Sequence, residues 1–361
     1  MPIALPIPTS HPIFPSLTRD DVDSTRISAW YRNFQYLTIP STIIDIASLG
    51  EWPAFFEWID SDSIFLPDES EGSHSTFRHA SPAASDSSSS SSSSSAPVYR
   101  LPKLNGAIRA AINKYGGAVF PKLNWTSPKD SAFILPQGSG GPLYCTTPAD
   151  VYLLLKSSDF IAHDLDPITA YEDCSDAENE RLRVELVLRK YVEIHPAREM
   201  RCFVRDSVLL GVSQRDTNYY EYLQQKETQI ALCDTIRAFW EDELRGTYPG
   251  RDYIFDICLS SDYRDVTLID INAYRPSTDP LLFTYLELHE VLETSQTSST
   301  DRPRLPILRV IDSRAHPDAN RNAPTYGSSM MPMEMVEMSQ GRSMVDFREA
   351  WDEAIAAGMR D

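Results

Sequence analysis

Three oxygen-bearing side chains lie close together in the last third of the chain, inside runs that are otherwise apolar. Asp270 and Asn272 are two residues apart in Val266–Asn272, so a strand would place both on one face. Asp256 lies in the preceding run, Ile254–Leu259, and an antiparallel hairpin would set it opposite them. Oxygen ligands without cysteine or histidine suit Mg²⁺, which completes its shell with water and phosphate oxygens. The alternative is an ordinary hairpin whose polar face is wet.

Basic side chains accompany these carboxylates. Lys122 and Lys129 flank a loop that follows a short apolar strand, with Trp125 and Ser127 between them. Further basic residues lie on the strands predicted for the middle of the chain, namely Arg189, Lys190, Arg201, Arg205 and Arg215. A metal-bound triphosphate satisfies both kinds of group, because lysine and arginine hold phosphate oxygens while carboxylates hold the ion. The alternative is cross-strand ion pairing without a ligand.

Signatures of other catalytic sites are missing from the sequence. It contains no P-loop, no G-x-G-x-x-G, no kinase catalytic loop and no H-E-x-x-H. His195 and His289 have no serine or cysteine at a spacing that indicates a nucleophile. Gly138–Gly141 is glycine-rich, which favours a flexible surface turn over a phosphate loop. We therefore predict no catalytic residue.

Hydrophobic periodicity predicts the elements that carry these side chains. Helical spacing indicates helices over residues 104–115, 149–157, 219–244 and 281–292, and a packed helical or mixed segment from about 20 to 60. Strand patterns lie at residues 118–120, 185–194, 199–205 and 208–213, besides the two acidic strands. Because the connections between residues 185 and 213 are short, we expect consecutive strands there to pair antiparallel.

Composition excludes several classes of protein. The chain has 361 residues, enough for two lobes with cores of their own. Its net charge of −19 argues against a nucleic-acid surface over the whole chain, although a local basic patch stays compatible with it. No apolar run is long enough for a bilayer, and the start of the chain lacks the basic region of a secretory signal. Five dispersed cysteines favour a reducing compartment, cytosol or nucleus, and we expect the cytoplasm.

Shifts in composition divide the chain into five parts. We expect a helical or mixed segment at 1–66 that completes the first lobe, a disordered serine-rich linker at 67–99, an N-terminal lobe at 100–184, a C-terminal lobe with the metal site at 185–295, and a partly disordered tail at 296–361. Ser87–Ser95 is an unbroken serine run. The tail is rich in methionine, and Phe347, Trp351 and Ile355 have the spacing of a helix that would dock on a partner or on its own domain.

Several motifs together resemble the cell division cycle protein 123 family. They are Val119–Asp130, Leu155–Ile161, Glu185–Lys190, Arg201–Val204, Gln214–Asp216, Ile269–Asn272 and Thr278–Phe283. The match runs in a consistent order from about Tyr31 to Leu292. The resemblance implies an α+β, ATP-grasp-like fold, in which two α/β lobes with antiparallel sheets enclose a nucleotide cleft.

The resemblance also implies a function. The chain would bind ATP and Mg²⁺ and act as an assembly chaperone for the gamma subunit of eukaryotic translation initiation factor 2, promoting its assembly with the alpha and beta subunits. That role supports translation initiation and cell-cycle progression, and it implies a monomer with no nucleic-acid or membrane partner. An ATP-grasp carboxylate–amine ligase is the first alternative, although no acceptor site is identified. A scaffold whose polar cluster is only structural is the second.

Carried over residue by residue, the resemblance assigns a ligand set. Lys122, Lys129 and Arg201 are implied to meet the phosphates, with Trp125 and Ser127 lining the same site; Arg189, Lys190 and Tyr191 are implied as the adenine hinge, Glu199 as a ribose contact, and Asp256, Asp270 and Asn272 as Mg²⁺ ligands. Three positions depart from the family pattern: Lys129 replaces an arginine of some relatives, Met200 an aromatic residue, and Ala273–Tyr274 a proline–phenylalanine pair. None of these departures removes a ligand, but a lysine makes a point-charge contact where arginine makes a bidentate one.

Overall fold

The computed structural model describes residues 12–62, 65–70, 98–135, 141, 143–176, 182–296, 304–313 and 315–317. The serine run, residues 138–140 of the glycine-rich turn and the methionine-rich tail lie outside the described residues. Contacts group the chain into two compact units, one of residues 1–215 and 222–310 and one of residues 216–221 and 311–361. Within the described part of the second unit, the Tyr220 hydroxyl donates to the Asp216 carboxylate at 2.6 Å. Both sheets of the protein belong to the first unit.

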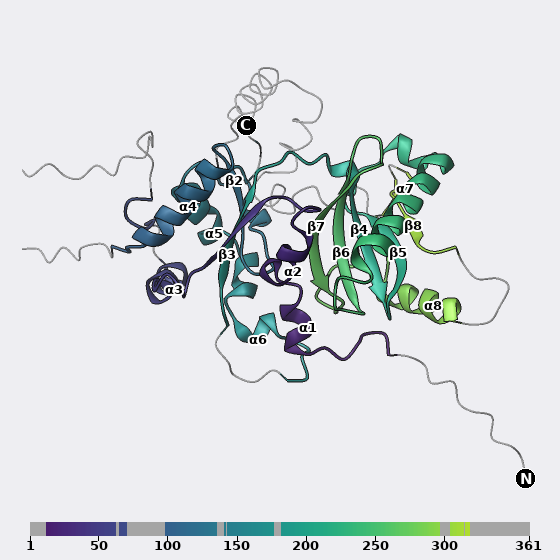
Figure 1. Ribbon diagram of the computed structural model, residues 1–361, viewed down its shortest axis with the longest axis horizontal. Coiled ribbons are helices and arrows are strands. Elements are labelled where there is room, and N and C mark those ends of the chain that lie inside the picture. The colour runs from purple at the N-terminus through teal and green to yellow at the C-terminus, as the bar shows by residue number, and fades with distance from the viewer. Residues whose placement is uncertain are drawn as a thin grey trace, which may run out of the picture. The chain divides into compact units, whose positions relative to one another are not determined.

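The first sheet has three strands in the order β1-β3-β2 (Figure 1). β1 (Ser41–Asp45) and β2 (Val119–Lys122) each pair antiparallel with the central β3 (Glu185–Lys190). β3 is buried along nearly its whole length, as expected for a strand covered on both faces. β1 falls within the region whose spacing indicates helices; the β-branched run Thr42–Ile44 favours a strand there, so this part of the segment is mixed rather than helical.

Most of the helices before β3 lie beside the first sheet, whereas α1 and α2 contact β7 (Val266–Ala273) of the second sheet (Figure 1). The helices before β3 are α1 (Arg19–Asp23), α2 (Ile27–Phe34), α3 (Trp52–Asp60), α4 (Pro102–Lys114), α5 (Pro148–Lys156) and α6 (Pro167–Ala170), with short 3₁₀ turns η1 (Lys129–Ser131) and η2 (Phe160–Asp164). The predicted helices at 104–115 and 149–157 are confirmed as α4 and α5. Thr147 begins α5 with a capping box, in which its side chain accepts from the Asp150 backbone N–H and the Asp150 side chain accepts in return.

The second sheet has five strands in the order β7-β6-β4-β5-β8. They are β4 (Glu199–Arg205), β5 (Val208–Gln214), β6 (Tyr253–Leu259), β7 (Val266–Ala273) and β8 (Ile307–Arg309), all antiparallel except β8, which runs parallel to β5. The segments between and after these strands include two turns and two helices: η3 (Pro196–Arg198), η4 (Glu221–Gln224), α7 (Lys226–Phe239) and α8 (Tyr285–Gln296). A π-helical turn, η5 (Trp240–Leu244), continues α7. The predicted hairpin of the two acidic strands is confirmed as β6 and β7. No helix among the described residues is both long and apolar enough to cross a bilayer.

One sequence prediction about pairing is wrong. The strand expected at 185–194 ends at Lys190 and pairs with β1 and β2, not with β4, so the chain passes from one sheet to the other between Lys190 and Glu199. β8 comes from the stretch expected as a partly disordered tail, for which the sequence predicts no pairing, and it pairs with β5. Both pairings join segments far apart in sequence, which local periodicity does not report.

Candidate functional site

The two sheets meet along β7. The Leu268 N–H donates to the Leu37 carbonyl at 2.8 Å, and the Thr38 hydroxyl donates to the Leu268 carbonyl at 2.6 Å. Arg189 on β3 reaches the same place, donating to the Ile269 carbonyl at 2.6 Å and to the Thr38 hydroxyl at 2.9 Å. Arg189 is 1% exposed, and its burial lowers the pKa of the guanidinium. Its side chain is therefore committed to joining the sheets.

A direct ion pair spans the same junction. Lys122 ends β2 and is 2% exposed, and its ammonium pairs with the Asp270 carboxylate on β7. The sequence predicts the first as a phosphate ligand and the second as a metal ligand. The structure thus brings one residue of each predicted kind into contact, across the two sheets.

The three predicted metal ligands share one face of the β6–β7 hairpin. Asp256 is the register partner of Asp270, and Ile254 that of Asn272, so strand alternation places all three polar side chains together. The Asn272 side-chain nitrogen is buried and, among the described residues, has no hydrogen-bond partner. An orphaned buried amide is costly, which marks this face as a candidate for a ligand.

Two arginines hold Asp256. Arg201 donates through Nε and Nη2 to the two carboxylate oxygens of Asp256, each at 2.8 Å. Arg215 Nε lies 3.5 Å from Asp256 Oδ2, and Arg215 Nη1 donates to the Glu199 carboxylate at 3.2 Å. Burial works to raise the pKa of the Asp256 carboxyl, but the two guanidinium groups hold that pKa well below its usual range. Asp256 is therefore an anion at every physiological pH.

Lys129 belongs to the same electrostatic cluster. Its side chain is exposed at the start of η1, following the loop after β2. The positive charge of Arg215 is the main cause that lowers the pKa of Lys129 to about 8, burial of the ammonium end lowers it further, and the carboxylates of Glu199 and Asp256 oppose the shift. An ammonium crowded by guanidinium groups favours an anionic ligand.

The donor set fits a hard cation such as Mg²⁺ rather than a softer metal. Over the described ranges, no three or more histidine, cysteine, aspartate and glutamate side chains gather in a way that could hold a metal ion. An ion here would need carboxylates, the Asn272 amide and oxygens from water or phosphate, which is the usual manner of Mg²⁺. Asp270 and Asn272 fit this role best, because Asp256 pairs with two arginines whereas Asp270 pairs with Lys122 alone.

The predicted hinge residues lie at the end of β3, where the chain leaves the first sheet. Lys190 ends β3 with an exposed side chain. The Tyr191 ring packs edge-on against Tyr144 with centroids 4.8 Å apart. Gly141 has a φ of +82°, a left-handed conformation that favours glycine, and a Cβ there would meet the Tyr191 hydroxyl at 2.9 Å.

Trp125 and Ser127 have different surroundings from the charged cluster. The Trp125 ring packs edge-on against His163 and Tyr171, and its backbone N–H donates to the buried Asp164 at 2.8 Å. The Ser127 carbonyl accepts from the Lys129 N–H at 2.8 Å. These contacts position the loop that carries Lys129.

Sequence reasoning missed the part played by Arg215. It was one of five basic residues on central strands and received no ligand role. Its contacts with Glu199 and Asp256 depend on the register of β4 with both β5 and β6, and its backbone N–H donates to the Glu199 carbonyl at 3.1 Å. The sequence signal was its place one residue beyond an apolar strand, in the motif Gln214–Asp216.

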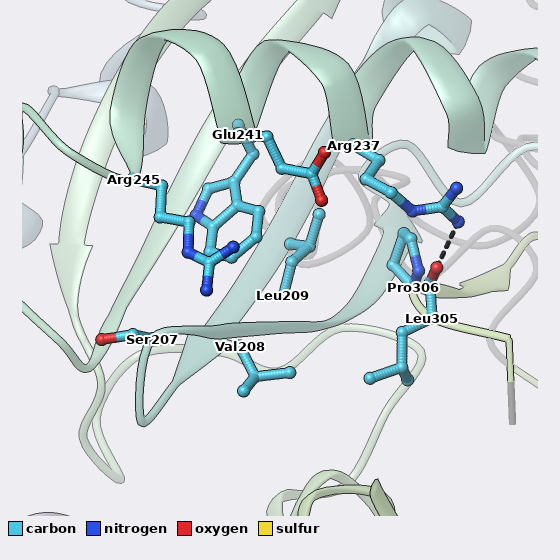
Figure 2. A pocket seen from close by; sticks show the side chains of 9 residues that line it. Ser207, Val208, Leu209, Arg237, Glu241, Arg245, Leu305 and Pro306 are labelled. Carbon is cyan, nitrogen blue, oxygen red and sulfur yellow. Dashed lines mark hydrogen bonds between the residues drawn. The ribbon is translucent and has the colours of Figure 1, made fainter. Parts of the chain in front are cut away.

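A cavity of about 190 Å³ lies between α7, the β4–β5 turn and the segment before β8, and no predicted site residue lines it (Figure 2). Arg237 donates to the Leu305 carbonyl there, and the Arg245 guanidinium lies 5.2 Å from the Trp240 ring centroid. Its cations are thus occupied by a carbonyl and a ring, and it is distinct from the charged cluster.

Comparisons with known proteins agree with one another. The D123 family model matches residues 30–339. A protein of Sclerotinia sclerotiorum named translation initiation factor eIF2 assembly protein is 31% identical over 377 residues, 95% of this chain and 89% of that protein. A protein of Aspergillus terreus named cell division cycle protein 123 is 31% identical over 404 residues, 95% of this chain and 91% of that one. The solved structure of Cdc123 from Schizosaccharomyces pombe is 33% identical, with a TM-score of 0.62 over 82% of this chain and 99% of that chain.

These matches confirm two predictions. The α+β fold class is confirmed by the shared fold with the Cdc123 structure and by the two sheets described above, and its ATP-grasp-like part stays a prediction. The motif resemblance is confirmed by the family match, which covers most of the chain. The chain belongs to the D123 family, the family of cell division cycle protein 123.

Proposed function

We propose that this chain is an ATP- and Mg²⁺-binding assembly chaperone for translation initiation factor eIF2. Relatives that match 95% of the chain carry the name eIF2 assembly protein, which supports the client. The client subunit is gamma, which the chaperone holds until the alpha and beta subunits join. The observation that carries the nucleotide half is the junction cluster, defined as Lys122, Lys129, Arg201, Arg215 and the carboxylates of Asp256 and Asp270.

Each member of the junction cluster has a role in this proposal. Lys122, Lys129, Arg201 and Arg215 meet phosphate oxygens, while Asp270 and Asn272, with Asp256 beside them, hold Mg²⁺. Bound Mg²⁺ supplies charge neutralisation of the triphosphate. Lys122 and Asp270 now neutralise each other, so a metal–phosphate pair offers each of them a replacement partner of the right sign.

The remaining predicted residues contact the adenine and the ribose or hold the phosphate loop. Lys190 and Tyr191 form the hinge beside the adenine by backbone and ring, with Arg189 fixing that strand to β7. Glu199 meets the ribose, and Trp125 and Ser127 hold the phosphate loop in place. A role in eIF2 assembly places the protein in the cytoplasm, acting as a monomer on its client.

No observation favours the carboxylate–amine ligase. A ligase must position an acceptor next to the phosphates. The cavity of Figure 2 has none of the junction cluster in its lining, and its cations already have partners.

Calorimetry tests the nucleotide half. ATP is titrated with Mg²⁺ and with EDTA into wild type, Asp270→Asn and the control Asp265→Asn, which changes an exposed carboxylate on the turn of the same hairpin. Wild type and the control should bind ATP only with Mg²⁺. Asp270→Asn should bind at least about tenfold more weakly, because the loss of one contact with a charged group costs about 1.5–3 kcal/mol. A folded wild type that binds no ATP in either condition refutes the site.

The client half has its own measurement. Purified gamma subunit is mixed with the chain and separated by size, and alpha subunit is then added. A complex with gamma that speeds incorporation of alpha supports the proposal. If no complex forms, gamma is not the client, and the calorimetric result on ATP binding is unaffected.

A further inference from the structure

The loop between Lys122 and Lys129 is held at its middle by one buried carboxylate. Asp164, at the end of η2, is 0% exposed. Its carboxylate accepts from the backbone N–H groups of Trp125 at 2.8 Å and Thr126 at 2.9 Å, and from the Thr126 hydroxyl at 2.7 Å. Hydrogen bonds to a carboxylate are charge-assisted and strong, so Asp164 fixes the backbone that separates the two lysines of the junction cluster.

His163 connects this carboxylate to the segment that follows β7. Its Nδ1 lies 3.0 Å from Asp164 Oδ1, and its Nε2 lies 3.1 Å from Arg275 Nη2. A guanidinium only donates, so Nε2 must accept, and an ionised carboxylate only accepts, so Nδ1 must donate. The two partners together assign the neutral tautomer of His163 that carries its proton on Nδ1.

Arg275 fixes the other end of this connection. It follows Asn272 by three residues and is 7% exposed. Its Nη1 donates to the Ala170 carbonyl at 2.8 Å, and its own carbonyl accepts from the Tyr285 hydroxyl at 2.8 Å. Because the guanidinium is buried and held in this way, His163 bridges two defined points, the loop of the lysines and the end of the strand that carries the proposed metal ligands.

We propose that neutral His163 is a positioning residue of the nucleotide site, which keeps the loop between Lys122 and Lys129 in register with β7. It acts through Asp164 on one side and Arg275 on the other, rather than by contact with the nucleotide. A small displacement of this loop moves both lysines relative to the phosphates, which is enough to weaken their contacts. This inference rests on the nucleotide half of the proposed function and adds a residue outside the junction cluster.

Protonation of His163 would break this connection. An imidazolium donates from both nitrogens, so its Nε2–H would point at the Arg275 guanidinium and two cations would face each other. Other titratable or charged groups lie beside the imidazole, beside the Trp125 ring that packs on it, or beside the guanidinium: Asp164, Arg26, Tyr171, Glu172, Asp173 and Cys174. Affinity for Mg²⁺–ATP should therefore fall on acidification, as His163 loses its contact with Arg275.

The test measures Mg²⁺–ATP affinity of the full chain by calorimetry from about pH 7 to about pH 5, a range in which histidine takes up a proton. The variants are His163→Asn, which keeps a donor for Asp164 but loses the acceptor for Arg275, and Arg275→Gln, which removes the facing charge. The matched controls are His289→Gln on α8 and Arg264→Gln, which changes an exposed arginine on the turn between β6 and β7. Thermal melts check that each variant is folded, and nitrogen-15 NMR of the histidine side chains reports the tautomer of His163.

At pH 7 both variants should bind Mg²⁺–ATP about threefold to tenfold more weakly than wild type, while the controls stay within about twofold. On acidification the variants should lose less affinity than wild type and the controls, because protonation of the nucleotide is common to all of them. The NMR spectrum of wild type at pH 7 should show His163 protonated on Nδ1.

Three results would overturn the role of His163 and leave the nucleotide site standing: wild-type affinity in both variants, weaker binding that declines with pH as steeply as in wild type, or a proton on Nε2 at pH 7. If wild type binds no ATP at any pH, the nucleotide site itself is refuted, and this role of His163 fails with it.

Discussion

Single charges in this protein are set by their neighbours more than by their own chemistry. Asp256 is buried yet ionised, because Arg201 and Arg215 compensate its desolvation. Lys129 has the opposite situation, since the cation beside it makes its own protonation harder. Arginine at this position would stay charged at any pH that a protein tolerates. With lysine, the charge at this position depends on pH.

The pH dependence of ATP binding should report Lys129. Its pKa is lowered to about 8, so the ammonium is present at pH 7 and is lost as the pH rises through 8. Affinity for Mg²⁺–ATP should therefore fall between pH 7 and 9, by up to about tenfold for each pH unit above the pKa. Lys129→Arg should flatten this decline. Calorimetry at several pH values measures it, and parallel profiles for the two proteins would show that Lys129 does not meet the nucleotide.

At the scale of elements, the short turn η1 is fixed to the segment that follows α5. η1 carries Lys129, and the next residue, Asp130, binds residues of that segment. Its carboxylate accepts from the Ser158 hydroxyl, from the Asp159 N–H at 2.7 Å and from the Phe160 N–H at 3.2 Å. The loop that carries Lys129 is thus anchored by one side chain to the residues between α5 and η2.

Replacing Asp130 should lower both the stability of the protein and its affinity for ATP. Asp130→Ala removes three hydrogen bonds, and we expect a loss of about 1–3 kcal/mol in the free energy of unfolding and weaker ATP binding, because Lys129 loses its anchor. Asp159→Ala is the control, since this exposed neighbour makes no side-chain capping hydrogen bond. Urea denaturation and calorimetry provide the two readouts. Unchanged ATP affinity in a destabilised Asp130→Ala would show that the turn does not transmit position to Lys129.

For the molecule as a whole, the contacts along β7 decide whether the two sheets act together. Arg189, Thr38 and Lys122 each bind β7 from the side of the first sheet. Because the buried Arg189 and the Lys122–Asp270 pair are costly to separate, we infer that the two sheets unfold in one cooperative step.

Thermal melting with Mg²⁺–ATP examines this inference. A ligand that binds only the folded protein stabilises it by about 2.7 kcal/mol at a hundredfold excess over the dissociation constant. A single transition should move up by a few degrees with Mg²⁺–ATP, should not move with ATP and EDTA, and should move by less in Asp270→Asn, because its weaker binding leaves a smaller excess of ligand over the dissociation constant. Two transitions, of which nucleotide moves only one, would mean that the sheets unfold independently.

The sequence by itself determined the parts that depend on neighbours along the chain. Apolar spacing located α4 and α5, and alternation located the hairpin of β6 and β7 with its polar face, because these patterns repeat within one element or one tight turn. The motifs around Lys122, Lys129 and Asp270 identified the family, which the comparisons confirm.

Only the tertiary structure decided which distant segments meet. β3 lies between β1 and β2 instead of beside β4, and β8 adds to β5 from a stretch that composition predicted to be loose. Arg189 binds the backbone of β7, and Lys122 pairs with Asp270, which is 148 residues away in the sequence. Such contacts are selected by the free energy of the whole fold, in which burial and charge pairing offset the entropy of closing long loops. No local period in the sequence records that balance.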